Sequence, residues 1–295
     1  MKLRSGLISI SLLSILSSTA QESSKAKLVF NGVSLYTGVL SHQGQVGSLS
    51  DFKKLAKGSE LLETDLTGYD VNSLFYGNES GSIGGVNVHF KFVNDQKVDQ
   101  KIFSSMRFGI SLADGRNLSK SYSKSEDFRV DTLTSSRSGE EYYVDSTASQ
   151  NLYLDYSQSQ VFLSAAYLIG SNPEERFSFF TGVGLMSGIA IDASTYISKS
   201  NSSYTENSRS INDELTREYN SKSEDEYFKN KMAFTMIASI PIGVDFRIGT
   251  VRKFWKGSHL MLEYQPSLYY YSIPELNTST MTTASIWSFT YKFQF

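Results

Sequence analysis

The sequence predicts an all-β protein: an eight-stranded, up-and-down antiparallel transmembrane β-barrel with long polar extracellular loops and short periplasmic turns. Three observations lead to this fold class. Apolar residues recur at every second position along several long segments, and the connections between these segments alternate between long and short. The amino terminus also has the features of an export signal.

The amino terminus predicts a secretory signal peptide over residues 1–20. Lys2 and Arg4 give a positive start, an apolar run follows over 6–16, and the small residues Ser18 and Ala20 precede the expected cleavage site. The apolar run is too short for a membrane-spanning helix. Residues 21–295 are expected to form one outer-membrane β-barrel domain. The chain contains no cysteine for a lipid anchor, a disulfide or a thiolate metal site.

The composition favours strands and gives no reason to expect a nucleic-acid partner. The chain has 18 Tyr and 19 Phe but only 4 Pro, and its net charge is −2, so no strong positive field surrounds it. The longest apolar stretch after residue 20 covers 233–244, which is too short for a spanning helix and contains Pro241. If the protein spans a membrane, it must therefore do so with strands.

The clearest alternation covers residues 231–248. Its even positions, such as Met232, Phe234 and Ile242, are apolar, whereas most of its odd positions are small or polar. This pattern is typical of a strand with one face towards lipid and the other towards a barrel lumen. The spanning strands are predicted over 27–38, 83–92, 102–111, 151–169, 176–191, 231–248, 259–271 and 287–295.

The connections support the same topology. Short links are expected over 93–101, 170–175 and 249–257, long links over 39–82, 112–150 and 192–230, and a medium link over 273–281. Strict alternation places all short turns on the periplasmic side and all long loops outside. Two features allow other interpretations. Pro241 and Pro266 fall inside proposed strands, and a hairpin within 112–150 could raise the strand count to ten.

Two segments carry a resemblance to a known group. The carboxy-terminal segment SIWSFTYKFQF resembles the targeting signal of outer-membrane barrels, in which Tyr291, Phe293 and Phe295 would engage the barrel assembly machinery. The stretch SQSQVFLSAAYLIGSNPEERFSFFTGVGLMSG resembles the middle hairpin of the Bacteroidota "outer membrane protein beta-barrel domain" group. That group is similar in architecture to the outer membrane protein A and X barrels. The resemblance implies an outer-membrane location and leaves the function open.

The predicted inward face is unusually rich in charge. We expect an eight-stranded barrel to have an interior that its side chains just fill, so opposite charges should pair there. Glu263 is expected to lie between Lys292 and Arg247 of the neighbouring strands. The cluster serves either as a structural plug, as an ion path or gate, or as a catalytic constellation. Its predicted members are His89, Lys91, Arg107, Asp245, Arg247, Glu263 and Lys292.

The long loops are the second candidate for function. Residues 112–150 contain two alternating pieces, DFRVDTL and EEYYVD, which predict a hairpin above the membrane. Residues 39–82 contain DFKKLAKGSELL, in which Phe52, Leu55 and Leu62 share one face of a short helix that could cap the barrel mouth or contact a partner. Residues 192–230 form a polar loop with strand extensions at its ends. An extracellular ligand is expected at these three loops, but no residue identifies it.

An enzyme is the third hypothesis, and the sequence supports it least. The segment around Ser258, His259 and Glu263 offers the residue types of a hydrolytic triad, but strand alternation places Ser258 on the opposite face. We therefore predict no catalytic residue, cofactor or metal. The leading hypothesis is a non-enzymatic outer-membrane barrel, with lipid as its surroundings and a structural or surface-recognition role. The alternative is a narrow pore or a component of a secretion machine.

Overall fold

A computed structural model describes residues 26–71, 78–94, 102–134, 136–139, 141–207, 217–249 and 252–295. The predicted signal peptide, residues 1–20, lies outside the described residues. No helix in the described part of the chain is long and apolar enough to cross a membrane.

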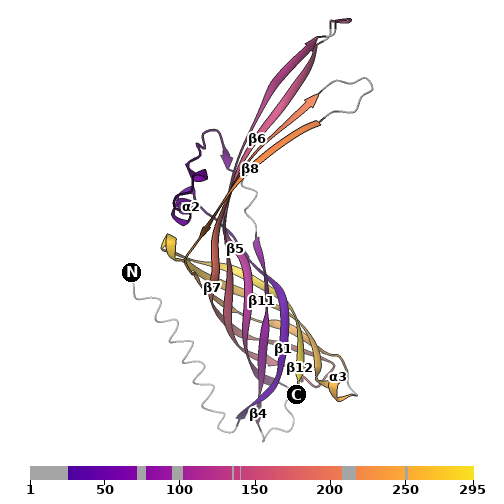
Figure 1. Cartoon of the computed structure of the whole chain (residues 1–295). Coiled ribbons are helices and arrows are strands. Elements are labelled where there is room, and N and C mark those ends of the chain that lie inside the picture. Colours follow the sequence, from indigo (N-terminus) through magenta and orange to yellow (C-terminus); the bar gives the residue numbers. More distant parts are fainter. Residues whose placement is uncertain are drawn as a thin grey trace.

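The chain forms one antiparallel sheet that closes on itself (Figure 1). Eight places form the ring, and the pairing of β1 with β12 and of β11 with β9 and β10 completes it. In order, these places are held by β1 (Ala26–Gln43), β4 (Asn78–Asn94), β5 (Phe103–Thr134), β6 (Glu141–Gly170), β7 (Phe177–Asn207), β9 (Phe234–Ser239) with β10 (Ile242–Arg247), β11 (Ser258–Ile273) and β12 (Thr278–Gln294).

The strand count needs one correction. The described residues form twelve strands rather than eight. One predicted strand, 231–248, is interrupted and supplies both β9 and β10. In the part of the chain that the structure describes, the short strands β2 (Gln45–Val46) and β3 (Asp70–Val71) pair only with β5, and β8 (Arg217–Lys229) pairs only with β7. The hairpin within 112–150 continues β5 and β6, so it adds no place to the ring.

The two prolines explain the interruption. Ile240 and Pro241 separate β9 from β10, and the neighbouring strand β11 carries Pro266 at the same level. Neither proline can donate a backbone hydrogen bond, so a gap in the ladder here accommodates both. Their carbonyl groups still accept hydrogen bonds, from Gly182 N to Pro241 O at 3.0 Å and from Ile240 N to Pro266 O at 3.0 Å.

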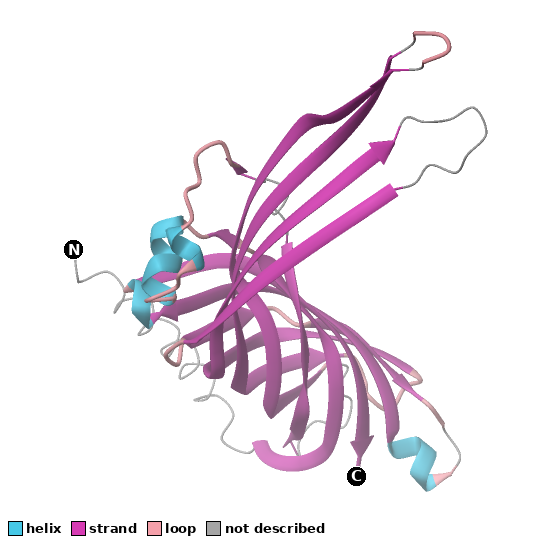
Figure 2. Ribbon diagram, turned by 45° about the horizontal axis from the view of Figure 1, so that its top comes forward, coloured by secondary structure: helices cyan, strands magenta, loops and turns pink. Residues whose placement is uncertain are grey.

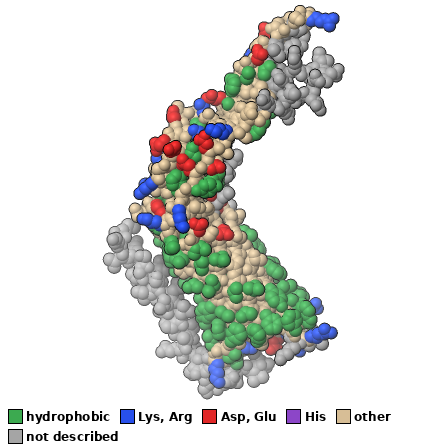
Figure 3. Space-filling model, viewed as in Figure 1, with side chains coloured by type: hydrophobic (Ala, Val, Ile, Leu, Met, Phe, Trp, Pro, Cys, Tyr) green, Lys and Arg blue, Asp and Glu red, His purple; other side chains and the backbone are tan. Residues whose placement is uncertain are grey.

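Alternation along the strands creates an apolar outer belt. In β9 the side chains alternate between exposed and buried at every residue, as a closed sheet requires. Figure 3 shows the belt on one side of the molecule as a green band across its lower part, with most charged side chains of that side above or below it. Its most exposed members include Leu35, Ile110, Leu163, Phe179, Val183, Leu262 and Phe289.

Three ring strands continue beyond the barrel and are joined there by β8, and together they form a sheet that we call the blade. It consists of residues 118–134 of β5, 141–157 of β6, 193–207 of β7, and β8. Figures 1 and 2 show it projecting from the end of the barrel opposite α3 (Lys253–Gly257). Most of the described residues in the expected loops 112–150 and 192–230 are therefore strand. The hairpin expected within 112–150 is confirmed by continuous pairing up to Thr134 and Glu141.

A small helical cap lies where the blade leaves the barrel (Figure 2). It comprises α2 (Leu49–Leu55), η1 (Leu61–Glu63) and η3 (Pro274–Leu276). Ser48 and Asp51 form a reciprocal capping box that fixes the start of α2. Phe52, Leu55 and Leu62 are buried and belong to one apolar cluster with the upper lumen, but the single helix predicted for them ends at Leu55, and Leu62 lies in η1.

Candidate functional site: the lumen and the blade

Arg107 of β5 and Glu263 of β11 form a bidentate ion pair in the lumen. Arg107 Nη1 lies 2.6 Å from Glu263 Oε2, and Nη2 lies 2.7 Å from Oε1. The two strands lie on opposite sides of the ring, with three places between them in either direction. Only 8% of Arg107 and 1% of Glu263 is exposed. A fork-to-fork pair of this kind holds both charges in a dry interior and ties opposite walls together.

A second polar group lies closer to the turn end of the barrel. Asp245 accepts from His259 Nδ1 at 2.7 Å through one carboxylate oxygen and from Lys292 Nζ at 3.0 Å through the other. Nearby, Ser34 Oγ and His89 Nε2 lie 2.8 Å apart. All five side chains are buried, so both oxygens of the Asp245 carboxylate and its two basic partners are satisfied inside the barrel.

The expected partners of Glu263 were wrong. Pairing places Glu263 opposite Gly243 and Ser288, whereas Arg247 and Lys292 both lie opposite His259, four residues away along β11. Glu263 is therefore out of reach of the two basic groups expected beside it. It pairs instead with Arg107, which lies across the lumen rather than on a neighbouring strand.

The structure brings together five of the seven predicted lumen residues: His89, Arg107, Asp245, Glu263 and Lys292. Arg247 is only half-buried near the turn end, and Lys91 is exposed where β4 ends. His259 also belongs to this group, although it is not among the seven predicted residues. The sequence could have predicted this position, because His259 lies four residues before Glu263 on β11 and therefore faces the same side of the sheet.

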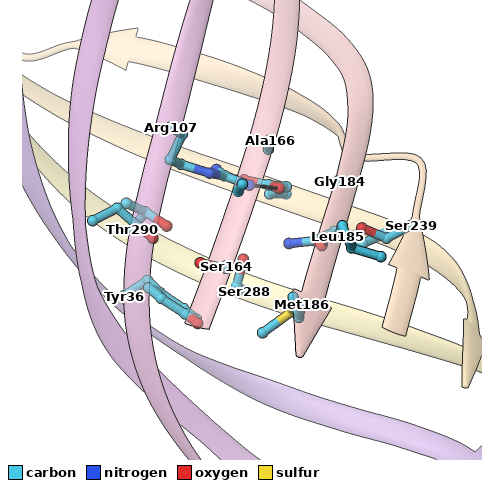
Figure 4. Close-up of a pocket in the computed structure, with 14 residues that line it drawn as sticks. Tyr36, Arg107, Ser164, Ala166, Gly184, Leu185, Met186, Ser239, Ser288 and Thr290 are labelled. Carbon is cyan, nitrogen blue, oxygen red and sulfur yellow. Dashed lines mark hydrogen bonds and ion pairs between the residues drawn. The ribbon is translucent and has the colours of Figure 1, made fainter. Parts of the chain in front are cut away.

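A small cavity remains between these groups. Its volume is about 30 Å³, and its lining includes Tyr36, Arg107, Glu263, Ser288 and Thr290. Figure 4 shows side chains from several strands converging on this space. Such a volume accommodates about one or two water molecules, which the surrounding hydroxyl and carboxylate groups can bind.

The blade end of the lumen is closed by larger side chains. Phe162 and Ile286 are almost fully buried, and Tyr269 stacks on His42 with ring centroids 4.8 Å apart. Phe52 of the cap belongs to the same apolar cluster as Phe162 and Ile286. The lumen thus consists of an apolar layer under the cap, a polar layer with the small cavity, and a charged layer near the turn end.

The cap also anchors the blade. Glu226 of β8 accepts hydrogen bonds from the Ser59 hydroxyl and, at 3.1 Å, from the Glu60 backbone N–H. Asn230, just after β8, donates to Leu55 O at 2.8 Å and accepts from Thr195 Oγ1 at 2.8 Å. Because these contacts hold the base of β8 against the cap, the blade leaves the barrel in a defined direction.

The remaining predicted site residues lie on β12 and at the start of β11. Tyr291 and Phe295 are exposed on the outer surface, and Phe293 is half-buried near Phe254. The Ser258 hydroxyl donates to Phe254 O at 3.1 Å and lies 3.0 Å from the Tyr291 hydroxyl, whereas the His259 ring bonds Asp245. Within the described residues, no group of three or more His, Asp or Glu side chains is arranged to hold a metal ion.

Comparison with known proteins gives only structural neighbours. No protein family model matches the sequence, and no curated protein matches it. Among solved structures, the chain is similar to the attachment invasion locus protein Ail of Yersinia pestis, with a TM-score of 0.26 and 10% identity over 90% of this chain and 99% of that chain. It is also similar to the beta domain of the Bordetella autotransporter BrkA, with a TM-score of 0.23 and 11% identity over 90% of this chain and 100% of that chain. These neighbours are outer-membrane β-barrel proteins.

Proposed function

We propose that this protein is a non-enzymatic, non-conducting barrel of the bacterial outer membrane that presents the blade for recognition at the cell surface. One observation carries the proposal: three strands, β5, β6 and β7, run from the apolar belt into a polar sheet outside it, above a filled lumen. Export through a signal peptide over 1–20, and assembly through Tyr291, Phe293 and Phe295, belong to the same proposal.

The outer belt supports a membrane location. Leu163, Phe179 and Leu35 expose 64%, 65% and 61% of their surface although the sheet is closed and has no free edge there. An exposed apolar band of this extent is costly in water and is stabilised in lipid. The closed hydrogen-bond ladder satisfies the backbone within that band, as a hydrocarbon environment requires.

The lumen supports a structural rather than a transport role. Its ion pairs join β5 to β11 and β12 to β10, so opening a path would break buried charge pairs. Its cavity holds about one or two waters. The cap closes the end from which the blade projects.

The blade supports recognition because it has no structural task within the barrel. Above the cap it is a two-sided sheet, and β8 forms its last strand among the described residues. Rigid elements that project beyond a membrane are suited to contact with external molecules.

A shortened blade tests the proposal. Residues 126–148 and 201–222 are replaced by Asn-Gly turns, which keep Ser125 paired with Ser149 and Ser200 with Ser223. Bacteria displaying each form are compared for attachment to host cells and matrix-coated surfaces. The proposal expects full attachment only with the intact blade, while both proteins keep the heat-modifiable gel mobility of a folded barrel. Equal attachment by the two folded proteins would contradict it.

A further inference from the structure

One face of the blade carries an array of Ser and Tyr hydroxyl groups, which we call the hydroxyl face. Residues two apart in a strand share a face, and the odd-numbered positions of β7 are turned towards the cap, where Ile197 is buried. The opposite face of β7 carries Tyr196, Ser198, Ser200, Ser202 and Tyr204. In register with them, β8 carries Tyr227, Asp225, Ser223, Ser221 and Tyr219.

Two pairs of tyrosines frame the serines. Tyr196 lies opposite Tyr227, and Tyr204 lies opposite Tyr219, eight residues further along each strand. Eight residues of strand span about 26 Å. The rings of Tyr196 and Tyr227 lie 4.8 Å apart, and Tyr153 of β6 extends the lower pair at 6.3 Å from Tyr196.

The rings of Tyr227 and Tyr219 are exposed, whereas those of Tyr196 and Tyr153 are half-buried and each have a carboxylate beside them. Tyr227 is 73% exposed and Tyr219 is 66% exposed. The Tyr196 hydroxyl donates to Asp225 at 2.9 Å, and the Tyr153 hydroxyl donates to Asp155 at 3.4 Å. An aromatic platform next to a hydrogen-bond acceptor is thus repeated on neighbouring strands.

The charge of this face excludes polyanions as its ligand. Between Tyr196 and Tyr204, the residues of β6, β7 and β8 on this face include two carboxylates, Asp155 and Asp225, but no Lys or Arg. Sulfated or phosphorylated polymers need cationic groups, which this face does not offer. The Ser and Asp residues that lie between the tyrosine pairs are depleted at protein interfaces.

We propose that the hydroxyl face binds a neutral glycan chain along the length of the blade. The C–H faces of sugar rings, which carry partial positive charge, pack on the electron-rich faces of Tyr196 and Tyr227. The serine hydroxyls both donate to and accept from sugar hydroxyls, and Asp225 accepts from them. This inference rests on the proposed function, since the blade must face the exterior.

The test uses the full-length mature protein in a sugar-free detergent and a panel of neutral and sulfated glycans. The panel contains dextran, mannan and chitohexaose, with dextran sulfate as the anionic comparison. Calorimetry is expected to detect binding to at least one neutral glycan. Affinity should fall about tenfold in Tyr196→Ala/Tyr227→Ala, because two ring contacts are lost. Tyr196→Phe/Tyr227→Phe, which keeps the rings, should retain most of it.

Lys222→Ala is the matched control, because Lys222 lies on β8 with the opposite parity. It should bind like the unaltered protein. No binding to any neutral glycan, binding only to dextran sulfate, or equal binding by the alanine variant would overturn the inference. If the shortened blade loses host-cell attachment while no neutral glycan binds, the recognition role stands and the glycan assignment fails.

Discussion

Arg107 and Glu263 join opposite walls of the barrel through two hydrogen bonds of 2.6 and 2.7 Å. Removing one member should leave a buried charge without a partner. Arg107→Met is therefore expected to cost about 3–5 kcal/mol of unfolding free energy, whereas Arg107→Met/Glu263→Met should recover most of that loss. Urea unfolding of the protein in lipid vesicles measures both.

The exposed pair of Arg129 and Asp145 provides the control for this prediction. It lies on the blade, and both side chains are more than half exposed. Arg129→Met should change the unfolding free energy by less than about 1 kcal/mol. If Arg107→Met behaved like this surface variant, the lumen pair would not be holding the barrel walls.

The cap depends on Phe52, whose side chain is fully buried. Phe52→Ala is expected to weaken the packing of α2 by about 3–5 kcal/mol, because a large apolar side chain leaves a cavity. Limited proteolysis should then cut within residues 49–63 while the barrel stays intact. Unchanged resistance to protease would show that the cap does not depend on this contact.

The membrane face is tested by Phe289→Arg. Phe289 is 51% exposed on β12 in the outer belt. A cationic side chain at the bilayer midplane costs about 2–4 kcal/mol in transmembrane barrels. Phe128→Arg is the control, because Phe128 is similarly exposed but lies on the blade. Equal effects of the two substitutions on folding into vesicles would contradict the proposed membrane position.

The start of α2 should be sensitive to acid. The pKa of Asp51 lies below its usual 3.8, mainly because the Ser48 hydroxyl donates to its carboxylate. Because the pKa is lower in the folded state, the ionised carboxylate stabilises the helix above pH 3.8. This stabilisation is lost as the pH falls through the pKa of the folded state. Amide exchange in α2, corrected for its intrinsic rate, should therefore speed up below that pH. The acceleration should be absent in Asp51→Asn.

The sequence was sufficient to predict the strands of the ring, but not to predict which charged side chains pair inside the lumen. The period-two alternation of apolar residues and the alternation of long and short connections predicted the spanning segments, because both patterns can be read from neighbouring residues along the chain. The partners of Glu263 could not be found in this way, since they depend on register and on closure across the ring. The assumption that the partners of Glu263 lie on neighbouring strands placed it beside Arg247. Arg247 lies on β10 opposite His259, which is four residues from Glu263 along β11.

The blade was also underestimated for a physical reason. Residues 192–230 are rich in Ser, Asn and charged residues, which favour loops when considered alone. In the structure, β7 continues through this segment because its backbone pairs with β6 as far as Val144 and Asn207. The alternation of Tyr196, Ser198 and Ser200 is visible in the sequence. The residues of β8 that lie opposite them are known only from the strand register in the structure.

Single-channel recording in a planar bilayer tests the central claim most directly. The purified mature protein is inserted, and its folded state is verified by heat-modifiable gel mobility. A lumen closed by Arg107, Glu263 and the charged layer around Asp245 predicts no conductance steps. Reproducible steps of uniform size that change in Glu263→Gln would contradict the closed lumen and identify the barrel as a pore.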